Sequence, residues 1–329
     1  MLSQGKLLRN VLILNMDKQL EDISATMYEK KIEDLNSEEL FIVVVFMVKR
    51  LIETFVRNLG EKKFYYISNN FSKGSFLENN LLNLGIYKVL EGVLASKGKD
   101  ISELKKIEEE YMGEQQSFKE TSYRFFEQSM QLEIPAEALG IRSVIRYEDR
   151  DKNFGTYEKE KSWLVKHDVN YDVTFDGVET LVAYYDMDVV GSNQEIYKFH
   201  LFDFQMGQKV DEEQLELLCD YFLVHCSVKL ILQQMRSNQY DLRKMDAYAR
   251  IGMEGKYISL VIPELIHVLV DEKAIPLPEA IELVRKTCGY NDYSSMLEEL
   301  EKCPVSYVEK LAPHLIETIK TSGVMSSDK

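Results

Sequence analysis

The residues that could bind a metal ion or act as nucleophiles are few and scattered. The sequence has four cysteines without a C-x-x-C pair, and Cys219 and Cys226 are spaced to share one face of a helix. Buried thiols are therefore the expected role of this pair, with a metal site or a disulfide as the alternative. The five histidines show neither H-x-x-x-H nor H-E-x-x-H spacing, so metal catalysis has no visible site.

The charged and aromatic residues do not form an evident acid–base site either. Adjacent Asp, Glu and Lys pairs are typical of solvated helix faces, and none has a convincing acid–base arrangement. His267 is expected to be a structural or surface histidine. Trp163, the single tryptophan, is expected in the core.

Composition indicates a folded globular chain with an acidic surface. Hydrophobic residues make up 45% and charged residues 29% of 329 residues, with a formal net charge of -15. Such a surface repels phosphate backbones and anionic lipid, so nucleic-acid and membrane binding are not expected. The N-terminus lacks a cleavage-site pattern, and the longest uncharged apolar run, Leu40 to Val48, is too short to span a bilayer. We therefore expect a cytoplasmic, reduced protein.

Helical patterns dominate the N-terminal third. Residues 1–38 are amphipathic and predict a helical extension that packs on the body or on a partner. Leu40 to Leu59 contains β-branched residues, but twenty residues without a turn former favour a buried helix. Leu77 to Leu94 predicts another helix, and Asp100 with Glu103 has the spacing of a capping box that begins a further one.

The rest of the chain mixes strands and helices. The Asp176-Gly177 pair predicts a hairpin between Val173–Phe175 and Val178–Tyr185. Asp211 and Gln214 have the spacing of a capping box. Other predicted strands are Phe64–Ser68, Ile196–Phe204 and Ala249–Met253; other predicted helices are Glu120–Leu132, Asp211–Arg236, Ser259–Asp271, Pro278–Cys288, Met296–Lys302 and Pro304–Thr321. This mixture predicts an α/β fold, with a main domain at 39–322 and a flexible tail at 323–329.

Seven stretches, in collinear order from about residue 40 to residue 318, carry a family resemblance. The most distinctive are FYYISNNFSKGSFLENNLLNLGI at Phe64–Ile86 and IPELIHVLVD at Ile262–Asp271. They resemble the N-terminal half of the α-glucan phosphorylase family, which acts on glycogen, starch and maltodextrin. The resemblance implies many helices around a mixed, Rossmann-like sheet, as in a GT-B glycosyltransferase.

The same resemblance implies glucosyl transfer to phosphate with pyridoxal phosphate as cofactor. The family's second domain, which carries the lysine that forms the Schiff base, has no counterpart in this sequence, so we expect no cofactor. The family's glycine-rich loop corresponds to Glu110–Phe125, where one glycine, Gly113, is out of phase. The anion site of that loop is therefore expected to be lost.

Two site histidines of the family also have no counterpart. Tyr257 stands for one of them, with Gly255 and Glu254 for the preceding aspartate and asparagine. Tyr293, between Asp292 and Ser294, stands for the other. Tyrosine is not a base near pH 7, and its ring would fill the space of a sugar. The resemblance therefore implies a fold that is kept and a reaction that is not.

The replacements leave two interpretations of the cleft. Tyr257 and Tyr293 could fill the emptied space or could stack against a sugar ring. The candidate ligand-contacting residues are Lys256, Tyr257, Asp292, Tyr293 and Ser294. The segment near 205–216 replaces a longer family dimer helix, and Gln233 and Gln234 replace paired arginines of phosphate-effector sites in some members. Family allostery and the family dimer are therefore not expected.

Three functions follow from the sequence. The first is a non-catalytic regulatory, scaffold or partner-binding protein, whose former interdomain face is covered by a homodimer partner or another protein. The second is a carbohydrate-binding module for an α-glucan or sugar phosphate. The third is a subunit that completes an active phosphorylase with a separate chain carrying the pyridoxal phosphate domain.

Overall fold

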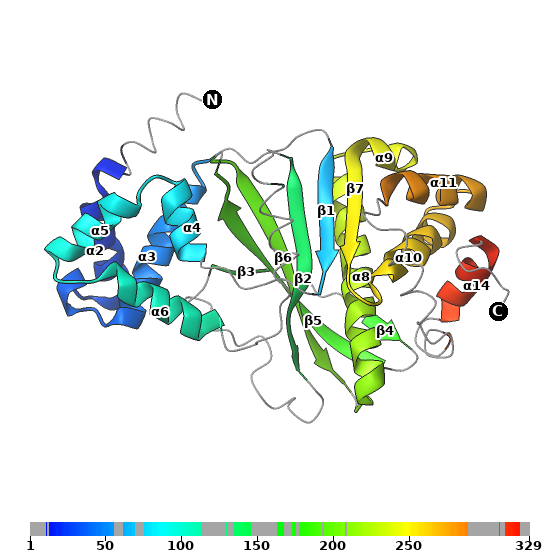
Figure 1. The fold of residues 1–329 in the computed structure, drawn as a ribbon, viewed down its shortest axis with the longest axis horizontal. Coiled ribbons are helices and arrows are strands. Elements are labelled where there is room, and N and C mark those ends of the chain that lie inside the picture. The colour runs from blue at the N-terminus through cyan, green and yellow to red at the C-terminus, as the bar shows by residue number, and fades with distance from the viewer. Residues whose placement is uncertain are drawn as a thin grey trace.

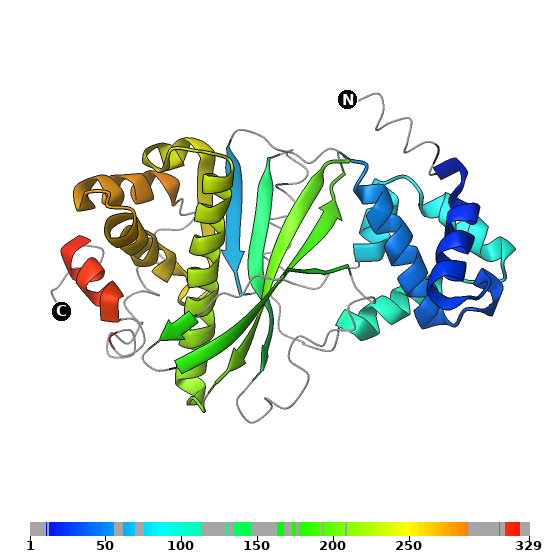
Figure 2. The ribbon, with the colours of Figure 1, turned by 180° about the vertical axis from the view of Figure 1, so that it is seen from behind.

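The fold is a mixed sheet between two layers of helices, as Figures 1 and 2 show from opposite sides. The computed structural model describes residues 11, 13–55, 62–69, 76–112, 129, 134–145, 163–167, 173–175, 178–192, 194–207, 209–288, 309 and 313–322. Within these residues the sheet has seven strands in the order β3-β5-β6-β2-β1-β7, with β4 also paired to β5. The predicted α/β architecture with a mixed sheet is confirmed.

The centre of the sheet is parallel and one side is antiparallel. β1 (Lys63–Ser68) pairs in parallel with β2 (Ala136–Ile145) and β7 (Ala249–Glu254), and β2 pairs in parallel with β6 (Ile196–Met206). β5 (Val178–Val190) runs antiparallel to β6, and β3 (Val165–His167) and β4 (Val173–Phe175) pair antiparallel to β5. The carboxyl ends of the parallel strands therefore share one edge, and their amino ends share the opposite edge.

The strand predictions were largely confirmed, with two omissions. The β4–β5 hairpin pairs Phe175 with Val178, as the Asp-Gly signal predicted. β5 and β6 continue beyond the predicted ends, to Val190 and Met206. β2 and β3 were not predicted: AEALGIRSVI has few residues of high β-propensity, and β3 has three residues.

The N-terminal helices form one layer. It consists of α2 (Met16–Tyr28), a short turn at Ile32–Asp34, α3 (Ser37–Ile52), α4 (Phe76–Asn83), α5 (Tyr87–Ser96) and α6 (Ile101–Met112). α3 confirms the buried helix, although it ends before Leu59. It begins with a capping box between Asn36 and Glu39. α2 packs against α3 through Met16, Leu20 and Ile23, all buried in the same hydrophobic cluster.

The single helix predicted over Leu77–Leu94 is wrong. α4 ends at Asn83 and α5 begins at Tyr87, because Gly85 adopts φ +72 between them. Such a backbone angle is accessible to glycine at little cost and ends a helix. At α6, the Asp100 side chain accepts from Ser102 N, while the Glu103 carboxylate binds the Ser37 hydroxyl, so the predicted reciprocal capping box does not form.

The second layer is built on α8 (Glu212–Ser237), which lies along the other face of the sheet (Figure 2). It also contains α9 (Met245–Tyr248), α10 (Val261–His267), a π-helical turn (Val268–Glu272), α11 (Leu277–Thr287) and α14 (Pro313–Ser322). α8 confirms the predicted helix but not its cap, since the Asp211 side chain makes no capping hydrogen bond. Predicted features at 120–128, 176–177, 289 and 296–302 lie outside the described residues.

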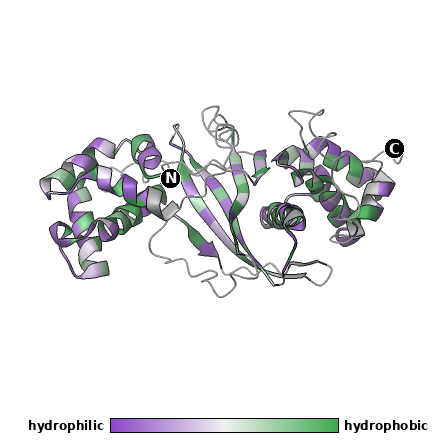
Figure 3. Cartoon of the chain, turned by 60° about the horizontal axis from the view of Figure 1, so that its bottom comes forward, coloured by the Kyte–Doolittle hydropathy of each residue, from purple (hydrophilic) through white to green (hydrophobic). Residues whose placement is uncertain are grey.

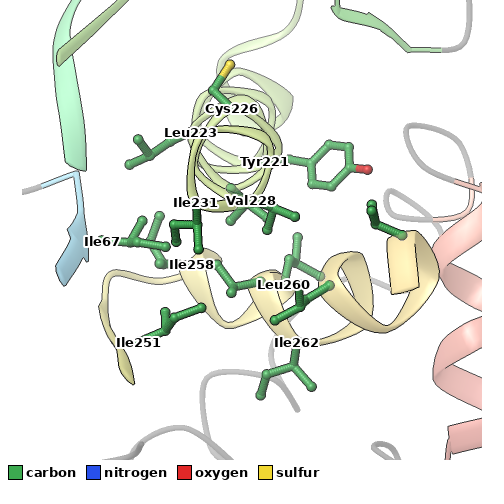
Figure 4. Packing of buried hydrophobic residues seen from close by; sticks show 14 of the residues in the cluster. Ile67, Tyr221, Leu223, Cys226, Val228, Ile231, Ile251, Ile258, Leu260 and Ile262 are labelled. Carbon is green, nitrogen blue, oxygen red and sulfur yellow. The ribbon is translucent and has the colours of Figure 1, made fainter. Parts of the chain in front are cut away.

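Residues of α8, β1 and the 3-10 turn Ile258–Leu260, which precedes α10, pack together in the core of this layer. Figure 4 shows Val228 and Ile231 on the side of α8 that faces Ile258 and Leu260, with Ile67 of β1 next to them. The layer also buries the carboxyl group of Glu264 on α10, which accepts from the Tyr221 hydroxyl and lies 2.7 Å from His225 Nδ1. These partners satisfy a carboxylate that would otherwise be costly to bury.

Several residues singled out in the sequence have structural roles. Cys219 and Cys226 are buried free thiols on α8, as expected. Trp163 is buried, and its Nε1 donates to Glu108 at 2.7 Å. His267 Nδ1 lies 2.6 Å from Asp271 Oδ2 one turn later, at partial exposure. Hydrophobic and hydrophilic segments alternate along the helices of both layers (Figure 3), as amphipathic helices require.

Within the described ranges, no helix is long and apolar enough to cross a membrane. The same ranges contain no group of three or more His, Cys, Asp or Glu side chains placed to hold a metal ion.

Candidate functional site

The carboxyl edge of the parallel strands is where an open α/β sheet places its ligands. The last residues of β1 and β7, Ser68 and Glu254, are paired neighbours. The segments that follow them therefore lie together, with Asn69 after β1 and Gly255, Lys256 and Tyr257 after β7. This is the part of the predicted site that the structure describes.

Asp220 of α8 joins these two segments. Its Oδ1 accepts from Asn69 Nδ2 at 2.6 Å and its Oδ2 accepts from the Tyr257 backbone N–H at 3.1 Å. The side chain is almost fully buried, and this burial raises its pKa to about 7 although both hydrogen bonds act in the opposite direction. Asp220 was not singled out in the sequence, since only the register of β1 and β7 reveals its partners.

Tyr257 is part of the core rather than of an open surface. It is 5% exposed and belongs to the hydrophobic cluster of α8, α10 and α11. Lys256, about half exposed, forms an ion pair with Glu216 at 2.8 Å, and its ammonium lies 4.8 Å from the centre of the Tyr257 ring. The hydrogen bonds to Glu216 and Tyr257 raise the pKa of Lys256 above its ordinary value.

The turn between β7 and Tyr257 is tightly closed. Gly255 adopts φ +136, and a Cβ atom there would lie 2.7 Å from Ile258 Cγ1 and 3.0 Å from Asn69 Oδ1. Beside it, the Tyr66 hydroxyl donates to Glu254 Oε2 at 2.6 Å. Asn69 Nδ2, the Tyr66 hydroxyl and the Tyr257 N–H bond to groups of the protein itself, whereas Asn69 Oδ1 is buried without a hydrogen-bond partner.

The predicted site residues are only partly placed. Lys256 and Tyr257 adjoin each other and Asp220. Asp292, Tyr293 and Ser294 lie outside the described residues, as does most of the segment at Glu110–Phe125. Their role in the cleft stays a prediction.

The opposite, amino edge of the sheet contains a pocket of about 360 Å³. Its walls are the first residues of β1, β2 and β6, parts of β3 and β5, and the last two turns of α8. Gln233 and Gln234, which stand for the paired arginines of the resembling family, both line this pocket.

Glu137 is the centre of a hydrogen-bond network in this pocket. Its carboxylate accepts from Lys63 Nζ at 2.5 Å and from Gln234 Nε2 at 2.8 Å, and it lies 2.7 Å from His200 Nε2. The Tyr184 hydroxyl lies 2.6 Å from the other ring nitrogen of His200. Burial acts to raise the pKa of Glu137, but His200 and Lys63 together lower it far below its usual range.

A second ion-pair group lies across the pocket. Lys198 Nζ is 2.6 Å from Asp186 Oδ2 and 3.3 Å from Asp188 Oδ1. His167 Nε2 is 2.9 Å from Asp186 Oδ2. No local spacing in the sequence marks these residues, because the antiparallel register of β3, β5 and β6 brings them together.

The comparisons with known proteins agree with the resemblance. A family model described as carbohydrate phosphorylase matches residues 191–324. A maltodextrin phosphorylase of Streptococcus pneumoniae serotype 4 is 27% identical over 337 residues, covering 92% of this chain and 45% of that protein. The brain and liver forms of glycogen phosphorylase of Homo sapiens are each 24% identical over 324 residues, covering 78% of this chain and 38% of each relative. The chain thus spans less than half of the length of these relatives.

Proposed function

We propose that this chain, which is similar to the carbohydrate phosphorylases, acts as a non-catalytic binding or regulatory protein. The part it matches corresponds to the N-terminal, Rossmann-like half of the phosphorylase fold. The observations that support the proposal lie at the carboxyl edge of the sheet, where open α/β sheets bind their ligands.

The burial of Tyr257 carries the proposal. The resemblance places a sugar-contacting histidine at this position, and here a phenol ring is packed in the core with its backbone held by Asp220. A tyrosine hydroxyl is a poor general base near pH 7, and the ring occupies space that a sugar would need. The buried ring favours the interpretation that Tyr257 fills the former cleft over the interpretation that it stacks on a ligand.

The described residues at this edge do not fit pyridoxal phosphate. A Schiff base forms from a neutral amine, whereas Lys256 is ion-paired with Glu216 and its pKa is raised. If the chain does act as a hexosyltransferase subunit, the reactive lysine must come from another polypeptide segment.

The proposed partner is a protein, either a second copy or another chain, that covers the former interdomain face. An α-glucan is the second candidate, because the relatives are named maltodextrin and glycogen phosphorylases. Loss of catalysis at the carboxyl edge is compatible with either partner.

The test is a phosphorolysis assay on the purified chain. Maltodextrin, inorganic phosphate and added pyridoxal phosphate are supplied, and release of glucose 1-phosphate is measured against a no-protein blank. We expect no release above the blank, from wild type or from Tyr257→His. Phosphate-dependent release by the wild-type chain, lost on Lys256→Ala, would contradict the proposal.

A further inference from the structure

The pocket at the amino edge is a second candidate site, and it lies at the opposite edge of the sheet from Tyr257. Residues of five strands and the end of α8 form its walls. Its volume of about 360 Å³ is near the lower end of ligand pockets, which span roughly 300–1,000 Å³. This size suits a small ligand, such as a monosaccharide or disaccharide.

The polar groups of the pocket are held in place before any ligand arrives. Glu137 is fixed by Lys63, His200 and Gln234, and His200 is fixed in turn by Tyr184. Gln234 also accepts from the Tyr65 hydroxyl at 2.8 Å. Groups fixed in this way bind a ligand with little further loss of conformational freedom.

The charges of the pocket disfavour an anion. Two lysines, Lys63 and Lys198, face three carboxylates, Glu137, Asp186 and Asp188, so the lysines and carboxylates of the lining sum to a formal charge of 2 − 3 = −1. Each lysine is already ion-paired with a carboxylate. A phosphate group would have to break these pairs or remain close to unneutralised carboxylates.

The C-terminal end of α8 also disfavours an anion in the pocket. This 26-residue helix ends at Ser237, beside the pocket, and its C-terminal carbonyls carry partial negative charge. Exposed Gln233 and Ser237 line the pocket here and supply amide and hydroxyl groups that both donate and accept. Such groups match the hydroxyls of a neutral ligand.

We propose that this amino-edge pocket binds an uncharged, hydroxyl-rich ligand of mono- or disaccharide size. Carboxylates and amide oxygens accept from the ligand hydroxyls, and amide and ammonium groups donate to them. Gln233 and Gln234 stand at positions where some members of the family that this chain resembles carry arginines for a phosphate effector. The two glutamines favour a different class of ligand. The proposal does not depend on whether the carboxyl edge is catalytic.

The experiment measures binding of three probes by isothermal titration calorimetry: maltose, glucose 6-phosphate and putrescine. Two variants test the location. Ser237→Trp places a bulky ring at the pocket from an exposed position, and Arg236→Trp makes the same substitution at an exposed neighbour that does not line the pocket. Circular dichroism melts confirm that both variants fold.

We expect maltose to bind the wild type more tightly than glucose 6-phosphate or putrescine. Its affinity should fall at least about tenfold in Ser237→Trp and change less than about twofold in Arg236→Trp. Tighter binding of glucose 6-phosphate or putrescine, equal maltose affinity in the two variants, or no maltose binding would each overturn the proposal. None of these outcomes bears on phosphorolysis, which the separate assay measures.

Discussion

Asp220 shows how one side chain can close the edge of a sheet. Its two oxygens bind groups from different segments, Asn69 after β1 and the Tyr257 backbone after β7. The carboxyl is buried, with Glu216 and Lys256 as the charged groups that also influence it. Its protonation state therefore couples pH to the stability of the region that contains Tyr257.

Replacing Asp220 by asparagine should change the pH dependence of stability. The folded pKa of about 7 lies above the ordinary value of 3.8, so the folded state binds the proton more tightly than the unfolded state. Wild-type stability should therefore fall as pH rises from about 4 to about 7, by up to about 1.4 kcal/mol per pH unit from this group, and then level off.

The measurement is urea unfolding of wild type and Asp220→Asn at several pH values from 4.5 to 8. The difference in unfolding free energy, wild type minus variant, should decline across this window. Asp211→Asn, at an exposed site immediately before the same helix whose side chain makes no capping hydrogen bond, serves as the control. A difference that stays constant with pH for Asp220→Asn would show that this carboxyl is ionised throughout.

Among the elements, α4 shows why the NNLLN sequence is retained. Asn79 and Asn83 donate to the Val190 carbonyl at 3.1 and 2.7 Å, and Asn80 accepts from the Val190 N–H at 2.9 Å. The three amides attach α4 to Val190, the last residue of β5. The motif therefore has a structural role in docking a helix onto the sheet.

Asn80→Ala should destabilise the fold by about 1–3 kcal/mol, because it leaves the buried Val190 N–H without its acceptor. Leu82→Ala on the same helix is the control, since Leu82 is exposed, and its effect should stay within about 0.5 kcal/mol. Chemical denaturation of both variants measures the two effects. Alanine is the better helix former at both positions, so helix propensity cannot cause a loss; equal effects of the two variants would mean that the Asn80 hydrogen bond does not hold α4 on the sheet.

Elements with strong local signals were predictable from the sequence, and those defined by distant contacts were not. The Asp-Gly hairpin and the long apolar helix α3 were identified, because residues that are neighbours in the sequence determine both features. β2 was missed because a central strand surrounded by other strands needs little intrinsic β-propensity. Gly85 ended α4 although the apolar pattern continued through it.

The same distinction applies to the two sites. Tyr257 and Lys256 could be identified because a motif match placed them, but their packing against Asp220 depends on a contact 37 residues away in sequence. The amino-edge pocket had no local signal. Glu137 and His200 come from adjacent strands 63 residues apart, and only their parallel register places them together.

At the scale of the whole molecule, the described residues form two hydrophobic clusters on opposite faces of one sheet. Alternate residues of β1 enter different clusters: Tyr65 and Ile67 pack with α8, and Tyr66 packs with the N-terminal helices. Strand β6 divides in the same way, with Phe202 and Phe199 on opposite sides. Loss of either layer would expose a face of the strands on which the other layer depends, so the two layers should unfold together.

Leu223→Ala tests this coupling, since Leu223 is fully buried on α8 whereas Trp163, the single tryptophan, lies in the cluster of the N-terminal helices. A buried Leu→Ala change costs about 2–5 kcal/mol. If the layers unfold as one unit, the urea midpoint from Trp163 fluorescence should shift as far as the midpoint from circular dichroism. Leu82→Ala should shift neither signal. A tryptophan transition that stays at its wild-type midpoint, while the circular dichroism transition moves or splits, would show that the sheet does not couple its two layers.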